Sequence, residues 1–169
     1  SMHSTALPLT LTQKMEFDPS QLGMSMSASM FAVAAFGGFG MAPLARFLGP
    51  AGMTKVGLVG RALTAPLTAI TVTTSHRSDQ IDVLRVALVS VLHALCAHSL
   101  ATGVTTQTTG AVEKHEQGAL LGLEHSLFSL ARIAGPSIGT MLLAMSPDGN
   151  FWYVAGACGF VDVALAVCL

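Results

Sequence analysis

The sequence predicts an all-α fold, a multi-pass membrane bundle of five transmembrane helices. Charged residues make up 10% of the 169 residues and hydrophobic residues make up 51%. No Asp, Glu, Lys or Arg occurs from Pro19 to Ala45 or from Val86 to Val112. Each run exceeds the ~20 apolar residues that cross a bilayer core, whereas a soluble domain has about 25% charged residues. Both observations indicate a protein embedded in lipid.

The five apolar segments are separated by short stretches rich in Gly, Pro or charge. The expected spans are 21–44, 54–74, 83–112, 118–145 and 151–169. Asp18, Pro19 and Gln21 form a start signal for the first, because Asp caps, Pro suits the first helical position and Gln completes a capping box. Trp152 and Tyr153 open the last span as an interfacial aromatic pair.

Lys and Arg give an expected topology. The loops after the first and third spans share one side of the membrane, with Arg46, Lys55 and Lys114, and with Arg61 nearby. The opposite side carries Lys14, Arg77 and Arg85. The positive-inside rule then places the first set in the cytoplasm. Residues 1–11 lack a basic region and a continuous apolar run, so no signal peptide is expected.

Small residues recur at four-residue spacing, which favours close helix packing in lipid. The pairs are Gly118 with Gly122, Gly135 with Gly139, and Ala155 with Gly159. The three cysteines lie singly in apolar stretches and are interpreted as packing residues.

Several ionisable residues lie at bilayer depth, where a charge costs about 2.5–3.5 kcal/mol and needs a partner or a water-filled cavity. Arg132 lies near the middle of the fourth span, and Glu124 lies about two turns inside it. Asp162 lies at a depth similar to that of Arg132, which suggests an Arg132–Asp162 ion pair. Arg132 is alternatively a substrate or coupling residue.

The third span carries His93 and His98, followed by a ladder of hydroxyl side chains that includes Thr102 and Thr106. The histidines are five residues apart, about 140° around a helix, so they cannot share one ligand. We therefore expect no metal and no cofactor. The adjacent Glu124, His125 and Ser126 would point in different directions on a helix, so no enzyme activity is expected either. The net charge of −1 predicts no nucleic-acid binding. The hydroxyls predict a polar cavity or polar neighbours.

The fourth span carries a family resemblance. Gly118 and Gly122, followed by Gly135, Pro136 and Gly139, resemble the eleventh helix of the major facilitator superfamily, and in particular its drug:proton antiporters and organic cation transporter-like proteins. The antiporter motif reads G-x-x-x-G-P-x-x-G-G, and here Ala and Thr replace its first and last glycines.

The segment 40–49 resembles a degenerate copy of the family's cytoplasmic loop signature. Gly40, Arg46 and Gly49 match, while Ala45 stands in place of the usual Asp. The erosion suggests the second repeat of the fold, and the first repeat is the alternative. On the preferred interpretation, residues 1–23 are the end of a preceding helix and its extracytoplasmic loop. Residues 24–169 are then helices 8–12 of a twelve-helix transporter.

The resemblance implies two six-helix halves that rock about a central solute site. Helices 7, 8, 10 and 11 line that site, which singles out Met30, Phe36, His98, Thr102, Thr106, Glu124, Ser126 and Arg132. The implied function is secondary active transport of a small organic solute or drug, coupled to protons. The implied partners are the lipid bilayer, the solute and the N-terminal half of the same transporter. The alternative is a non-transporting membrane scaffold or a truncated product.

Overall fold

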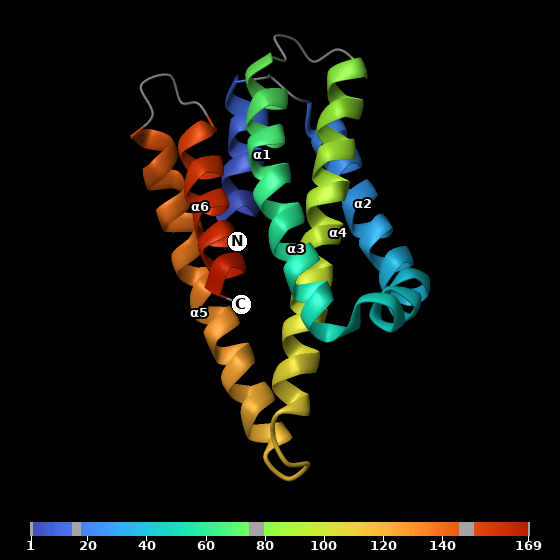
Figure 1. Cartoon of the computed structure of the whole chain (residues 1–169). Coiled ribbons are helices and arrows are strands. Elements are labelled where there is room, and N and C mark those ends of the chain that lie inside the picture. Colours follow the sequence, from blue (N-terminus) through green and yellow to red (C-terminus); the bar gives the residue numbers. More distant parts are fainter. Residues whose placement is uncertain (1, 15–17, 75–79, 146–150, 169) are drawn as a thin grey trace.

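The structure is a computed structural model that describes residues 2–14, 18–74, 80–145 and 151–168, and these residues form helices without a strand. Along the chain (Figure 1) the elements are α1 (Met2–Lys14), α2 (Pro19–Ala35), the π-helix η1 (Phe36–Gly40), α3 (Met41–Thr74), α4 (Gln80–Gly110), α5 (Gln117–Ala144) and α6 (Trp152–Cys168). The predicted all-α fold class is therefore confirmed.

The predicted start of the first span is also confirmed. Asp18 is the N-cap of α2, with extended backbone, and Pro19 is the first helical residue. The backbone N–H of Asp18 donates to Oε1 of Gln21 at 3.1 Å, as a capping box requires. Local side-chain chemistry thus fixes where this helix begins.

The first two predicted spans form one continuous helical stretch from Pro19 to Thr74, which reverses at Gly49. Gly49 has φ 66° and ψ 172°, values that a side chain would oppose and that glycine adopts freely. Figure 1 shows α2 running toward one end of the bundle and α3 returning from it. The expected break between the spans 21–44 and 54–74 is therefore confirmed.

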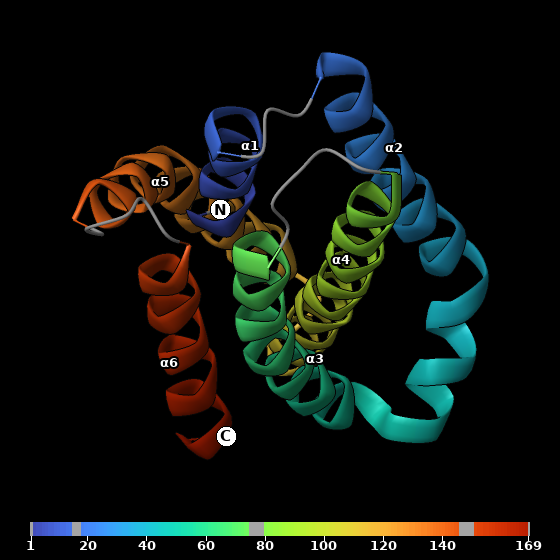
Figure 2. The same cartoon turned by 90° about the horizontal axis from the view of Figure 1, so that it is seen from above.

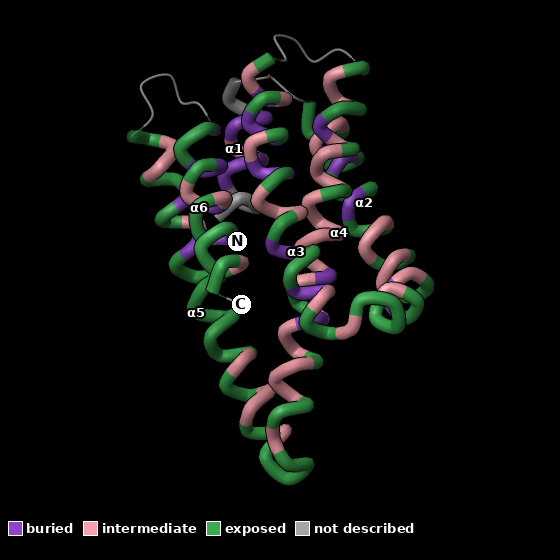
Figure 3. Tube along the Cα trace, in the orientation of Figure 1, coloured by how far each residue is buried: buried purple, intermediate pink, exposed green. Residues whose placement is uncertain are grey.

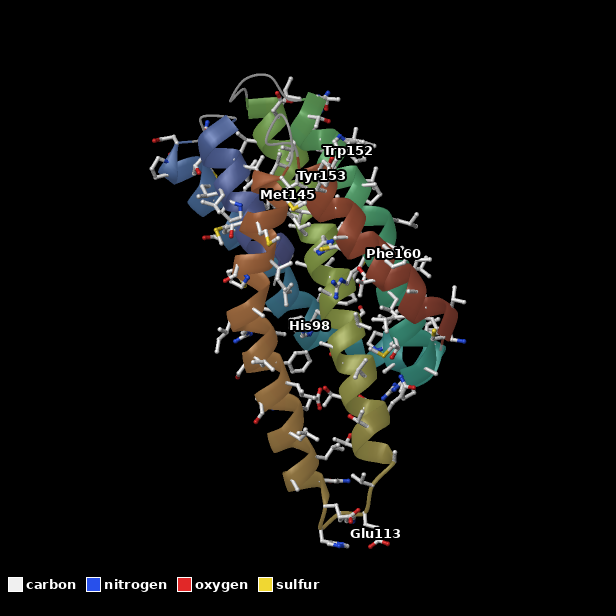
Figure 4. All side chains as sticks on the ribbon, turned by 90° about the vertical axis from the view of Figure 1, so that its left-hand side faces the viewer. His98, Glu113, Met145, Trp152, Tyr153 and Phe160 are labelled. Atoms are coloured by element: carbon white, nitrogen blue, oxygen red, sulfur yellow. The ribbon has the colours of Figure 1, made fainter. Side chains whose placement is uncertain are left out.

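The remaining spans match separate helices. Ile81–Gly110 and Gln117–Ala144 are long and apolar enough to cross a membrane. Trp152–Cys168 is a shorter apolar helix of 17 residues, at the lower limit of about 17–25 for a spanning helix. Trp152 and Tyr153 lie near one end of the bundle and Glu113 at the opposite end (Figure 4).

A buried apolar cluster ties α1 to the rest of the bundle. α1 packs against α5, α6 and α2 and lies between α5 and α2 in the view along the bundle (Figure 2). The cluster comprises Ala6, Leu7 and Leu11 of α1, Ala65, Ala69 and Val72 of α3, Val86 of α4, and Phe151, Val154, Ala155 and Cys158 at and along α6.

The helices α3 and α4 pack closely against each other, and glycine residues allow this close approach. A Cβ at Gly57 would lie 2.7 Å from the backbone of Leu100, and one at Gly60 would lie 2.5 Å from Sγ of Cys96. From α4, a Cβ at Gly103 would lie 2.8 Å from the backbone nitrogen of Thr54. At Gly57 and Gly103 a side chain would collide with the facing backbone, whereas at Gly60 the side chain of Cys96 would have to move. The two helices therefore approach as closely as small residues allow in membranes.

The prediction of close packing at Gly118 and Gly122 is wrong for this structure. Nothing among the described residues lies within 4 Å of a Cβ built at either glycine. Both are exposed, as is every residue of α5 from His125 to Ala134, and Figure 3 shows most of this helix as exposed. We call this exposed surface the outer face of α5. Gly135 and Gly139 are buried, as predicted for a packing pair.

Candidate functional site

A cavity of about 330 Å³ lies among α1, α2 and α4. Figure 2 shows how these three helices are arranged, with α3 beside α4. Its lining residues are Leu7, Pro8 and Leu11 of α1; Leu22, Ser25, Met26, Ser29 and Met30 of α2; Arg61 of α3; Ser90, His93, Ala94 and Ala97 of α4; and Cys158 of α6. The volume falls at the lower end of the ~300–1,000 Å³ typical of small-molecule sites.

The cavity lining combines apolar and polar side chains. Leucines and methionines of α1 and α2 supply much of the apolar part, and methionine adapts its shape to irregular ligands. Arg61, His93 and Ser90 supply polar groups from α3 and α4. Such a lining suits a small amphipathic molecule.

Arg61 forms an ion pair with Asp162 of α6. Nε of Arg61 lies 3.4 Å from Oδ2 of Asp162, and neither atom has a hydrogen-bond partner among the described residues. The Arg61 side chain is 27% accessible and the Asp162 side chain 4%. The contact is therefore ionic rather than hydrogen-bonded, with its carboxylate end buried and its guanidinium end at the cavity.

This ion pair corrects the predicted one between Arg132 and Asp162. Depth along the bundle was the basis of that prediction, but depth says nothing about the direction in which a side chain points. Asp162 points toward α3, whereas Arg132 is exposed on α5. A membrane-buried carboxylate needs a cation, and Arg61 meets that need.

His93 is positioned by α3. Its Nδ1 lies 2.8 Å from Oγ1 of Thr64, and that hydroxyl is also 3.2 Å from the backbone carbonyl of Arg61. Thr64 has one proton, so donation to the carbonyl leaves its oxygen to accept from Nδ1–H of His93. Thr64 thus connects His93 to the turn of α3 that carries Arg61.

The α4 residues that the family resemblance singled out, His98, Thr102 and Thr106, are not among the residues that line this cavity. His98 faces η1, where a Cβ built at Gly37 would lie 3.1 Å from its Nε2, and Figure 4 labels it on α4. Thr106 is exposed and donates to the carbonyl of Thr102 at 2.7 Å. The two histidines therefore contact different neighbours, η1 and α3.

Of the three candidate site residues on α5, only Glu124 forms a hydrogen bond with α4. Thr105 donates to Oε1 of Glu124 at 2.5 Å, while Oε2 of Glu124 is buried without a hydrogen-bond partner in the described part of the chain. Ser126 is exposed and donates to the carbonyl of Gly122 at 2.8 Å. Arg132 is exposed too. Glu124 lies between helices, whereas Ser126 and Arg132 lie on the open surface.

The motif residues occupy structurally distinct positions. Pro136 lies inside α5 between the buried glycines 135 and 139. In the loop signature, Gly40 ends η1, Gly49 adopts the positive φ of the reversal, and Arg46 is exposed. The loop signature therefore coincides with the point where α2 and α3 change direction.

Sequence reasoning missed Arg61 as a cavity residue. It lies within the predicted span 54–74 and was counted among the residues near the cytoplasmic loops. The signal was present, because a charge inside an apolar span needs a partner or a cavity. If Arg61 is treated as an intramembrane residue, it becomes the expected cationic partner of Asp162.

The long apolar helices indicate an integral membrane protein. The family model described as Major Facilitator Superfamily matches residues 1–169. The chain belongs to the major facilitator superfamily, a family of membrane transport proteins. Comparisons with curated proteins and with solved structures find no match.

Proposed function

We propose that this chain is the C-terminal half of a secondary transporter for a small organic solute and that transport is coupled to protons. Family membership over the whole chain supports transport in general. The cavity among α1, α2 and α4, with an arginine in its wall, carries the proposal for this chain. On this proposal residues 1–23 end a preceding helix and its loop, and residues 24–169 form a multi-pass bundle.

The outer face of α5 is proposed to face the other half of the transporter. Arg132 and Ser126 are exposed there among apolar side chains that include Leu127, Leu130 and Ile133. An arginine facing lipid at this depth would cost several kcal/mol, so a polar or water-filled neighbour is favoured. His98, Thr102 and Thr106 of α4 would then lie along the same pathway.

Glu124 is proposed as the proton-coupling carboxyl. Thr105 donates to one of its oxygens, and the other is buried without a partner. A carboxylate in that setting is poorly satisfied, and protonation removes its charge while keeping the bond from Thr105. Proton uptake and release at Glu124 would therefore accompany changes in its surroundings.

The test is solute-driven proton flux. The natural chain that contains residues 1–169 is reconstituted in liposomes loaded with a pH-sensitive dye, and a panel of organic cations, anions and neutral solutes is added. We expect at least one solute to produce proton movement. Glu124→Gln should reduce that movement at least about tenfold, since the neutral amide cannot carry the proton.

Glu113→Gln is the matched control, because this carboxylate is 81% accessible in the loop after α4. Its proton movement should equal that of the unaltered chain. Solute movement without proton movement would overturn the coupling alone. No movement of any solute would overturn transport and favour a membrane scaffold.

A further inference from the structure

The charge lining of the cavity among α1, α2 and α4 is one-sided. Among the described lining residues Arg61 is the single Lys or Arg, and none is Asp or Glu. Asp162 lies behind Arg61 with 4% of its side chain accessible. A molecule inside the cavity would therefore meet the cation of the ion pair and not its carboxylate.

The ion pair does not use all the capacity of Arg61. Guanidinium carries five N–H donors in a planar fork that matches a carboxylate. Its contact with Asp162 is made by Nε at 3.4 Å, and it is not a hydrogen bond. With 27% of its side chain accessible, Arg61 can reach a second anion from the cavity side.

The hydroxyl groups across the cavity do not provide an alternative anion site. Ser25 donates to the carbonyl of Leu22 at 3.1 Å, and Ser29 donates to the carbonyl of Ser25 at 3.0 Å. A hydroxyl has one proton, so these two present only acceptor lone pairs to the cavity. An anion would be held by Arg61 and repelled by the α2 serines.

We propose that this cavity binds a small organic anion, a carboxylate on an apolar body, and that Asp162 competes with this carboxylate for Arg61. The leucines and methionines of α1 and α2 would receive the apolar body. The inference rests on the proposed function in that it names its solute class. It differs from the family resemblance, which points toward cations.

The test is equilibrium binding to the chain in lipid nanodiscs, with three probes of nearly equal size. Phenylbutyrate is the anion, phenylbutanol the neutral analogue and phenylbutylammonium the cation. We expect phenylbutyrate to bind most tightly. Charge-assisted hydrogen bonds are worth about 1.5–3 kcal/mol, so Arg61→Gln should weaken phenylbutyrate binding about 10- to 100-fold. Phenylbutanol binding should be unchanged.

Lys55→Gln is the matched control, because it removes an exposed cation from the same helix, outside the cavity. It should bind all three probes as the unaltered chain does. Arg61→Lys should retain the preference for the anion with lower affinity, since lysine keeps the charge but not the fork.

The variant Asp162→Asn tests whether the ion pair between Arg61 and Asp162 controls ligand binding or only holds α3 and α6 together. Removing the competing carboxylate should tighten phenylbutyrate binding several-fold, whereas a mere tie between helices predicts no gain. The double variant Arg61→Gln with Asp162→Asn removes both charges, avoids an unpaired buried carboxylate, and should fold without anion preference. Equal binding of all three probes, or anion preference that survives Arg61→Gln, would overturn the inference.

The binding experiment and the transport experiment can disprove the two proposals independently of each other. If phenylbutyrate binds through Arg61 and no solute crosses the liposome membrane, the transport proposal fails and the anion site stands. If solutes cross and phenylbutyrate does not bind, the anion site fails and transport stands.

Discussion

The contact between α3 and α4 and the outer face of α5 both carry glycine, but their surroundings are opposite. At Gly57 an added Cβ would meet the backbone of Leu100 at 2.7 Å, whereas at Gly122 it would meet nothing within 4 Å. The intramembrane arginines differ in the same way, since Arg61 pairs with Asp162 and Arg132 is exposed. Residue type alone therefore does not tell a closed helix contact from an open face.

The largest expected change in stability comes from breaking the ion pair between Arg61 and Asp162, on the side where the helices are in close contact. Arg61→Gln leaves Asp162 buried without its cation and should lower the free energy of unfolding by about 3 kcal/mol or more. SDS titration in bicelles measures this. Arg132→Gln on the open side should change it by less than about 0.5 kcal/mol. Equal losses at the two arginines would contradict the comparison.

A single methyl group tests the glycine contact. Gly57→Ala forces α3 away from α4 and should cost about 2 kcal/mol. Gly122→Ala meets no neighbour and should be neutral or stabilising by up to about 1 kcal/mol, because alanine favours the helix. The same titration compares the two. A neutral Gly57→Ala would show that α3 and α4 do not touch there.

The hydrogen bond between Thr64 and His93 should have a smaller effect. Thr64→Val keeps the shape but leaves Nδ1 of His93 without this acceptor, at a cost of about 1 kcal/mol. Thr71→Val is the control, because Thr71 is bonded within its own helix, to the carbonyl of Leu67. It should change the unfolding free energy by less than about 0.5 kcal/mol.

The smallest expected change in stability concerns the hydrogen bond between Thr105 of α4 and Glu124 of α5. Thr105→Val removes the hydrogen bond to Glu124, both residues being half-buried. A double-mutant cycle with Glu124→Gln should give a coupling free energy of about 0.5 kcal/mol. Additive losses would show that α4 and α5 are not joined at this point.

Much of the fold follows from local chemistry that the sequence displays. The capping residues Asp18 and Gln21 predict the start of α2, and Gly49 lies in the stretch where a turn was predicted. Charge-free length predicts the long helices, because the bilayer sets that length. These features depend on neighbours in sequence.

The site was less predictable, because it depends on the direction in which side chains point across helices. Depth matched Asp162 with Arg132, although its partner is Arg61. Gly57 and Gly103 pack closely without the four-residue spacing that drew attention to Gly118 and Gly122. The rotation of each helix about its axis decides which residues pair and which glycines pack. This rotation depends on the neighbouring helices and cannot be read from one segment of sequence. The predicted roles of His98, Thr102, Thr106, Ser126 and Arg132 remain predictions.

The most direct test of the account is whether the open face of α5 lines a water-filled pathway. Ser126→Cys and, as control, Phe160→Cys on α6 are introduced into the natural chain after replacement of Cys96, Cys158 and Cys168. Both positions are exposed in this structure. Since thiolates form only where water reaches, a membrane-impermeant thiol reagent should modify Ser126→Cys at least about tenfold faster. Equally slow modification at both positions would place α5 against lipid and contradict the transporter proposal.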